Sequence, residues 1–260
     1  KPVMNVLKKL PLISSVIEKK VLQKLNESFG GEFKEVVIGG APLSEEVEAY
    51  LRKIGFKYTV GYGMTECGPL ISYAAHDINK LRSAGKVVDR MEMKINKEKP
   101  EMEIGEILVK GEHVMLGYYK NTEASKAAFT KDGWLKTGDL GYIDDEGFLF
   151  IKGRSKNLIL GPSGQNIFPE ELEARICNLP CIQECVVKEK DGKLIAMVYP
   201  DCESMDEQGI KESDVTEIME KNRSLLNREL PRYEQISKIE IVDEEFRKTP
   251  KRNIKRYLYS

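Results

Sequence analysis

Two short apolar runs, each followed directly by a glycine turn, place the strongest constraint on how this chain can fold. Residues 36–40 read Val-Val-Ile-Gly-Gly, and residues 58–61 read Tyr-Thr-Val-Gly. Between them, Pro42 and the glutamate-rich residues 44–47 mark the start of a helix. A further helix is expected earlier, over residues 14–28. Strand, helix and strand in this order predict part of a parallel α/β sheet.

The rest of the chain shows two other patterns. Residues 91–151 contain runs of alternating apolar and polar side chains around Gly and Asp turns, which predicts a small antiparallel sheet or barrel. Further on, Pro169 opens a helix. Two apolar runs then flank Asp191-Gly192, a dipeptide typical of a two-residue hairpin. With one more helix over about residues 213–230, this last part predicts a compact α+β domain.

Composition places the chain among ordinary globular proteins. Hydrophobic residues make up 41% and charged residues 32% of 260 positions, which is too apolar for general disorder. No run approaches the roughly 20 apolar residues that span a bilayer, and the first residues lack a secretory signal. A cytoplasmic protein is therefore expected.

Positive charge is concentrated at the end of the chain. Residues 246–260 hold six Lys and Arg and no acid, so the net charge of −1 leaves −7 for the first 245 residues. Such a tail is either merely solvated or meets an anion: nucleic acid, a membrane surface in peripheral contact, or the phosphates of a nucleotide or coenzyme.

Cysteine and histidine give little support for a metal site or a hydrolase. Cys177, Cys181 and Cys185 are four residues apart, a spacing that matches neither zinc nor iron–sulfur motifs, and a proline interrupts the segment. The two histidines, His76 and His113, have no nucleophile motif beside them. Reduced structural cysteines are the expected alternative.

Three motifs in a fixed order carry the strongest functional signal. Residues 61–66 read GYGMTE, residues 136–139 read KTGD and residues 153–156 read GRSK. GGAPL at 39–43 and GQNIFPEE at 164–171 accompany them. This ordered set resembles the adenylate-forming superfamily, specifically its acyl-CoA synthetases, and the resemblance covers essentially the whole chain.

The resemblance implies a fold that is α/β and α+β. Residues 1–90 would form the C-terminal part of the large α/β adenylation lobe, with the end of its parallel sheet. Residues 91–153 would form a small antiparallel β-barrel, and residues 154–260 a mobile, compact α+β C-terminal lid domain. The resemblance also implies ATP, Mg²⁺ and coenzyme A, since these enzymes activate a carboxylic acid as acyl-AMP, release pyrophosphate and transfer the acyl group to the coenzyme A thiol.

Several roles follow from the same resemblance in the GYGMTE motif. Tyr62 is expected to stack on adenine, Thr65 to contact the α-phosphate and Glu66 to help hold Mg²⁺. Catalytic roles are implied for Thr65 and Glu66. Gly63 would let the nucleotide approach the backbone closely, and the oxygen preference of Mg²⁺ agrees with Glu66 as its ligand. The plainer alternative is a tight turn with a buried tyrosine.

Other motifs are expected to complete the nucleotide site and the coenzyme A path. Asp139 resembles the acid that accepts both ribose hydroxyls, and Arg154 resembles the arginine that joins it; a turn aspartate is the alternative. Lys156 resembles the hinge of the lid domain, and Gly164 the glycine facing coenzyme A, although either could be an ordinary surface residue. The loop expected to line adenine and the acyl pocket consists of Gly39, Gly40, Ala41 and Pro42.

Two departures from the family pattern bear on activity. The chain has no Ser/Thr/Gly-rich phosphate loop ending in Lys, and it lacks the large lobe that precedes this region in the family. It therefore resembles the C-terminal half of a synthetase, with the missing N-terminal lobe as its expected partner. In addition, Asn253 occupies the position of the family's catalytic lysine. Lys251 or Lys255 could supply the charge instead if the loop shifts.

Three hypotheses remain. The first is part of a long-chain fatty-acid–CoA ligase that binds ATP or AMP, a fatty acid and coenzyme A, with this chain alone inactive. The second is a non-catalytic nucleotide- or acyl-binding homologue that has lost adenylation with the lysine. The third, a nucleic-acid binder using the basic tail, is disfavoured because two tyrosines do not make a stacking platform.

Overall fold

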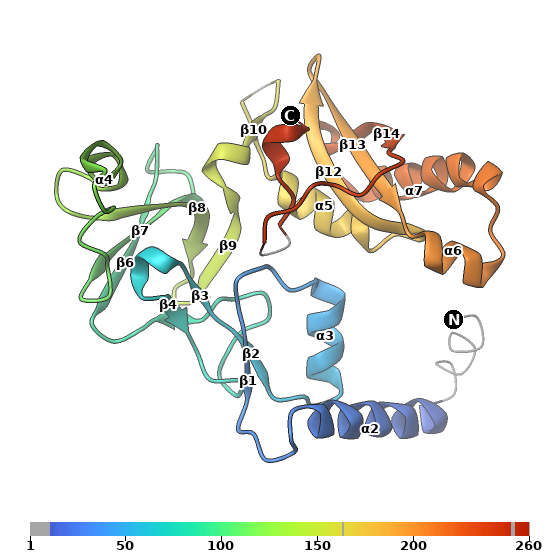
Figure 1. Ribbon diagram of the computed structural model, residues 1–260, viewed down its shortest axis with the longest axis horizontal. Helices are drawn as coiled ribbons and strands as arrows, with labels where there is room; N and C mark the ends of the chain where they lie inside the picture. Colours follow the sequence, from blue (N-terminus) through green and yellow to red (C-terminus); the bar gives the residue numbers. More distant parts are fainter. Residues whose placement is uncertain (1–10, 163, 251–252, 260) are drawn as a thin grey trace. The chain divides into compact units, whose positions relative to one another are not determined.

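The computed structural model describes residues 11–162, 164–250 and 253–259 (Figure 1). Their contacts divide the chain into two compact units, Lys1–Ile151 and Lys152–Ser260. Each unit has its own hydrophobic core.

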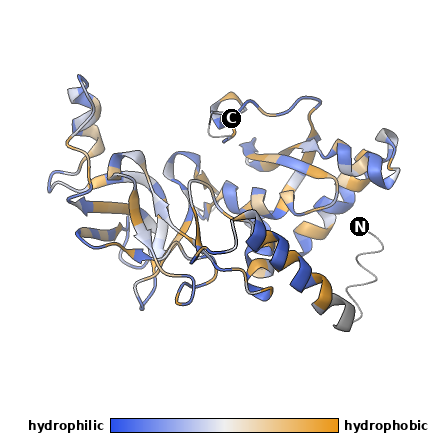
Figure 2. Cartoon of the chain, turned by 60° about the horizontal axis from the view of Figure 1, so that its bottom comes forward, coloured by the Kyte–Doolittle hydropathy of each residue, from blue (hydrophilic) through white to orange (hydrophobic). Residues whose placement is uncertain are grey.

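The first unit begins with a small α/β layer. Helix α2 (Pro11–Ser28) precedes strand β1 (Val36–Ile38), helix α3 (Glu45–Lys53) and strand β2 (Tyr58–Val60). The two strands pair in parallel. Helix α2 mixes apolar and polar residues along its length (Figure 2), and its Val21, Leu22 and Leu25 pack against the core of this layer.

Acidic residues lie in the first turn of α3 and basic residues in its last turn, so both ends complement the helix dipole. The core beneath is built on Ile54, Phe56 and Tyr58. The parallel pair and both helices confirm the α/β expectation for this region.

Two antiparallel sheets complete the first unit. Strands β3 (Tyr62–Gly63), β4 (Leu70–Tyr73) and β5 (Lys86–Val87) form one of them. Strands β6 (Met91–Asn96), β7 (Gly105–Gly111), β8 (Leu135–Ile143) and β9 (Leu149–Arg154) form the other, in that order, and the short helix α4 (Thr122–Ala128) lies between β7 and β8. The antiparallel expectation is confirmed, but the closed barrel is not: within the described residues β6 and β9 are the two edges of an open sheet.

The second unit is an α+β domain. The short strands β10 (Ile159–Leu160) and β11 (Asn166–Ile167) pair antiparallel and lead into helix α5 (Pro169–Cys177). Strands β12 (Ile182–Lys190) and β13 (Lys193–Pro200) form a hairpin, and helices α6 (Cys202–Gln208) and α7 (Val215–Glu229) precede strand β14 (Ile236–Ile241), which pairs in parallel with β13.

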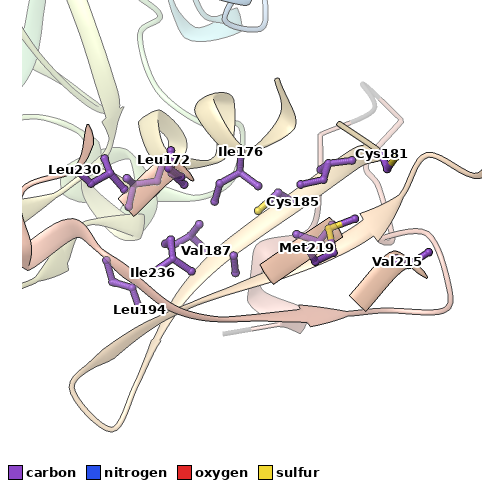
Figure 3. Packing of buried hydrophobic residues seen from close by; sticks show 14 of the residues in the cluster. Leu172, Ile176, Cys181, Cys185, Val187, Leu194, Val215, Met219, Leu230 and Ile236 are labelled. Atoms are coloured by element: carbon purple, nitrogen blue, oxygen red, sulfur yellow. The ribbon is translucent and has the colours of Figure 1, made fainter. Parts of the chain in front are cut away.

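The core of the second unit lies between its helices and its sheet. Figure 3 shows Leu172 and Ile176 of α5 and Met219 of α7 gathered with Val187 and Cys185 of β12. At the hairpin tip, Asp191 and Gly192 both have positive φ, at 53° and 73°. This is the backbone that a two-residue type I′ turn requires, so the hairpin prediction is confirmed.

Three of the five cysteines lie in or against the core of the second unit. Cys177, Cys181 and Cys185 belong to or pack against the core of the second unit, and the described residues contain no group of three side chains able to hold a metal ion. Across those residues, no helix combines the length and the apolar character needed to cross a membrane.

Candidate functional site

The two glycine loops of the first unit lie next to each other because their strands are parallel neighbours. Strands β1 and β2 run in the same direction, so the loops at 39–42 and 61–66 both begin at the carboxyl ends of strands. The Gly61 amide donates to the Ile38 carbonyl at 2.9 Å. A β-carbon at Gly39 would lie 3.1 Å from the Gly61 carbonyl oxygen. Gly39, Gly40, Ala41 and Pro42 are all exposed, so this edge presents backbone at the surface.

The GYGMTE segment folds into a tight turn that brings the chain back toward Pro69. Met64 donates its amide to the Pro69 carbonyl at 2.8 Å, and residues Thr65–Cys67 form a single 3-10 turn. A β-carbon at Gly63 would lie 2.0 Å from the Pro69 oxygen, which is inside van der Waals contact. Glycine at position 63 is therefore required by the fold, whatever approaches it from outside. The side chain of Thr65 is exposed beyond the turn.

We expect Gly63→Ala to lower the free energy of unfolding of the first unit by about 1–3 kcal/mol, because either the Pro69 backbone or the strand pairing must move. Gly61→Ala is the matched control, since a β-carbon there meets Leu70 and Val37 at 3.4 Å, an ordinary contact. Urea denaturation of both variants measures the difference. Equal stability of the two variants would show that the return at Pro69 is loose.

The structure brings Tyr62 and Asp139 together although 77 positions separate them in the sequence. The Tyr62 hydroxyl donates to Asp139 Oδ2 at 2.7 Å. Only 9% of Tyr62 and 7% of Asp139 are exposed. Burial, and then the negative charge of Asp139, raise the pKa of Tyr62 well above its ordinary value, so the phenol keeps its proton for this bond. The tyrosine thus orients the carboxylate.

A bulge in strand β8 positions Asp139. Glu106 pairs with Leu140 and Leu108 with Lys136, so four steps along β8 oppose two steps along β7. Gly138, with φ of 72°, permits this bend. The irregularity re-aims the side chain of the residue that follows, as bulges commonly do next to functional sites.

Thr137 holds the bulge in place. Its hydroxyl donates to the Ile107 carbonyl at 2.8 Å and accepts from the Asp139 amide at 3.1 Å. The Gly138 amide donates to the Glu106 carboxylate at 3.2 Å. Thr137 therefore holds the backbone of Asp139 while Tyr62 holds its carboxylate, which is the preorganisation expected of a binding group.

Glu66 has a partner that the sequence did not reveal. The Tyr118 hydroxyl donates to Glu66 Oε1 at 3.0 Å, and the Met115 amide donates to the Glu66 carbonyl at 2.7 Å. The hydrogen bond between Tyr118 and the Glu66 carboxylate is the main cause of the raised pKa of Tyr118. A half-buried, oriented carboxylate fits the oxygen ligation that Mg²⁺ prefers.

Three predicted site residues belong to the second unit. Arg154 ends strand β9 and Lys156 lies in the 3-10 turn that follows; both are exposed. Gly164, with φ of 81°, closes the turn between β10 and β11 by donating its amide to the Gly161 carbonyl at 2.9 Å, and open space lies where a β-carbon would be. Gly161 and Pro162 of this turn line an open hollow of about 430 Å³, whose lining includes the cations Lys193 and Arg232 and the carboxylate of Glu189.

The tail places Asn253 in a closed loop. The backbone amide of Asn253 donates to the Thr249 hydroxyl at 3.2 Å, and the backbone carbonyl of Asn253 accepts from the Thr249 backbone amide at 2.8 Å. The side chain of Asn253 is exposed. Lys251 lies outside the described residues.

Comparison with known proteins decides the family. Residues 4–119 match the family described as AMP-binding enzyme. The chain is 36% identical to the long-chain-fatty-acid–CoA ligase FadD15 of Mycobacterium bovis over 66% of this chain and 28% of that protein. It is 31% identical to the 2-succinylbenzoate–CoA ligase of Oceanobacillus iheyensis over 91% of this chain and 48% of that protein. The chain belongs to the adenylate-forming superfamily.

Solved structures of this superfamily agree. The o-succinylbenzoate CoA synthetase from Bacillus subtilis, in complex with its acyl-adenylate intermediate, matches with a TM-score of 0.73 and 29% identity over 93% of this chain and 50% of that one. The same synthetase with ATP and a magnesium ion matches with a TM-score of 0.69. The chain spans half or less of the length of these relatives.

Membership in the adenylate-forming superfamily leaves the role of each site residue as a prediction. Tyr118, Thr137 and Glu106 were not identified from the sequence, because their partners are distant along the chain. Two signals were present: Thr137 lies within the KTGD motif, and Tyr118 lies in a Gly-Tyr-Tyr run at 117–119.

Proposed function

We propose that this chain is part of an acid–thiol ligase that activates a carboxylic acid with ATP as acyl-AMP and passes the acyl group to coenzyme A. The observation that carries the proposal is the hydrogen bond between Tyr62 and Asp139, which joins two motifs of the adenylate-forming superfamily into one buried, preorganised acidic group. A turn aspartate would not need a buried phenol donor and a two-residue bulge to orient it.

Within this proposal, each side chain has a defined task in the first half-reaction. Asp139 accepts the ribose hydroxyls, Thr65 donates to the α-phosphate, and the loop of Gly39, Gly40, Ala41 and Pro42 borders the adenine. The substrate carboxylate attacks the α-phosphorus and pyrophosphate leaves. Mg²⁺, when bound, neutralises phosphate charge, and Glu66, oriented by Tyr118, is the residue proposed to hold it.

The second unit is proposed to serve the thiol-transfer half-reaction. The coenzyme A thiol attacks the acyl carbon of acyl-AMP, and AMP leaves. Gly164 offers an exposed turn with open space before it, past which a pantetheine chain could run. The neighbouring cations Lys193 and Arg232 suit the phosphates of coenzyme A. Arg154 and Lys156 keep their proposed roles at the nucleotide and at the hinge.

The acid is proposed to be a long-chain fatty acid, and the match to FadD15 supports this choice. Aromatic acids are the competing class, since the 2-succinylbenzoate–CoA ligase of Oceanobacillus iheyensis matches over 91% of this chain. We place the enzyme in the cytoplasm, with the N-terminal lobe of the same enzyme as its partner. The alternative, a homologue that binds nucleotide without turnover, rests on Asn253.

This chain by itself should not catalyse ATP–pyrophosphate exchange with any acid, because it carries no phosphate loop and little of an acyl pocket. Radioactive pyrophosphate exchange measures this directly across a panel of fatty and aromatic acids. The positive control is the longer protein, meaning this chain joined to the proposed N-terminal lobe. Exchange by the longer protein supports the ligase, whereas its absence together with retained AMP binding favours the non-catalytic homologue. Sustained exchange by the chain alone would refute the assignment of those parts to the other lobe.

A further inference from the structure

The tail after strand β14 folds back on itself as a small ladder. Lys248 and Ile254 form an isolated antiparallel bridge, and the Lys255 amide donates to the Arg247 carbonyl at 2.8 Å. Together with the Thr249–Asn253 bonds, these contacts close the loop from both sides. The ladder has two legs, one at residues 247–249 and one at residues 253–256. The position of Asn253 therefore depends on where these two legs are attached to the rest of the second unit.

One leg is attached by a largely buried ion pair. Arg256 contacts the carboxylate of Glu173 on helix α5, and its second guanidinium nitrogen donates to the Val187 carbonyl at 3.2 Å. The Val187 amide donates to the same Glu173 carboxylate at 2.6 Å. Arg256 and Glu173 expose only 20% and 16% of their side chains. One carboxylate thus links the tail, helix α5 and strand β12.

The other leg is attached by a second ion pair. Lys248 Nζ lies 2.5 Å from Glu184 of β12 and 3.1 Å from Glu245. Nearby, the buried ring of Phe246 meets the ring of Tyr259 edge-on, with centroids 4.9 Å apart. The ladder is thus attached to β12 through one leg and to both α5 and β12 through the other.

We propose that the Arg256–Glu173 pair is a positioning device that fixes the loop bearing residue 253 on the second unit for acyl-adenylate formation. The inference rests on the proposed function. Electrostatic stabilisation depends on a group held within a fraction of an ångström of its target, and an exposed loop has few contacts of its own to provide this. Arg256 touches no reacting atom; it acts through the backbone of the ladder.

Arg256 can be replaced without leaving an unpaired buried charge, because Glu173 can take up a proton instead. Burial, and to a smaller extent the charge of Glu170, raise the pKa of Glu173 to about 7 against the opposing effect of Arg256. When Arg256 is removed, Glu173 loses the cation that favours ionisation and is expected to take up a proton near neutral pH. A neutral buried acid that still accepts from Val187 costs far less than an unpaired charge.

The experiment compares Arg256→Met with Arg228→Met, a matched control at an exposed arginine in the last turn of α7. Two readouts are used. In this chain, hydrogen–deuterium exchange of the Thr249, Asn253 and Lys255 amides should speed up about tenfold or more in Arg256→Met and remain unchanged in Arg228→Met. In the longer protein, single-turnover adenylation and thioester formation from supplied acyl-adenylate are timed separately.

We expect Arg256→Met to slow adenylation at least about tenfold while thioester formation changes less than about twofold. It should also remove most of the rate gained by Asn253→Lys, because the new ammonium group would no longer be held in place. Arg256→Lys should restore part of the rate.

Three results would overturn the inference. One is unchanged tail exchange, and another is an adenylation rate that Arg256→Met does not alter in a protein that adenylates normally. The third, equal slowing of both half-reactions, would indicate a general structural role. Failure of the proposed function looks different: no variant, Asn253→Lys included, would form acyl-adenylate even though the tail exchange still responds to Arg256→Met. The positioning role would then fall with the reaction.

Discussion

Asn253→Lys in the longer protein should raise the rate of acyl-adenylate formation by about 10²- to 10³-fold, the range observed for one preorganised electrostatic group. An amide can donate a hydrogen bond but carries no charge, whereas an ammonium group stabilises the charge that develops between carboxylate and phosphate. The backbone at this position is already fixed by Thr249, so the lysine would extend from a defined point. Rapid-quench single-turnover assays measure the rate.

The second half-reaction is the internal control for this substitution. Thioester formation from supplied acyl-adenylate should not become faster, because the group at position 253 is assigned only to adenylation. If adenylation is already fast with Asn253 and lysine adds nothing, another residue supplies the charge. Lys251→Ala and Lys255→Ala would then identify it. A lack of effect from both would mean that the alignment of the tail with the family motif is wrong.

Asp139→Ala should weaken nucleotide binding about ten- to over a hundredfold, because it removes charge-assisted hydrogen bonds worth about 1.5–3 kcal/mol. Folding is measured separately by urea denaturation, because the buried Tyr62 hydroxyl also loses an acceptor. Asp139→Asn keeps an acceptor for Tyr62 while removing the charge, and it should separate the two effects. Asp145→Ala, an exposed aspartate on the nearby turn, is the matched control.

Elements with strong local signals were predicted well. The hairpin at Asp191-Gly192 needs two residues with positive φ, and few other dipeptides supply them as readily. Helix α5 begins at Pro169 as expected, because proline fixes the first helical φ and needs no amide donor there. The parallel pairing of β1 and β2 was predicted from two apolar runs, each ended by glycine, with a helix between them.

Short elements with weak apolar periodicity were missed. Helices α4 and α6 contain seven residues each, too few for an apolar face to be recognised. Their caps were readable, however: Asn121 accepts from the Ala124 amide at 3.0 Å and Asp201 from the Ser204 amide at 3.1 Å. The closed barrel was not found, because alternation predicts pairing within a sheet, whereas closure depends on the two edge strands meeting.

The candidate site was predictable as a set of motifs but not as a geometry. Sequence separates Tyr62 from Asp139 and Glu66 from Tyr118 by 77 and 52 positions, so no local pattern joins them. The bulge at Gly138 is likewise a consequence of register between two strands. These contacts arise from tertiary packing, and they are what turn a turn aspartate into an oriented acceptor.

The motifs at 61–66 and 136–139 are proposed to form one nucleotide site. Isothermal titration of the longer protein with AMP, for wild type, Asp139→Ala and Asp145→Ala, tests it most directly. Wild type and Asp145→Ala should bind with equal affinity, and Asp139→Ala should bind at least about tenfold more weakly. Equal affinity of all three proteins, with Asp139→Ala correctly folded, would show that Asp139 is only a turn residue and that the two motifs do not form a nucleotide site.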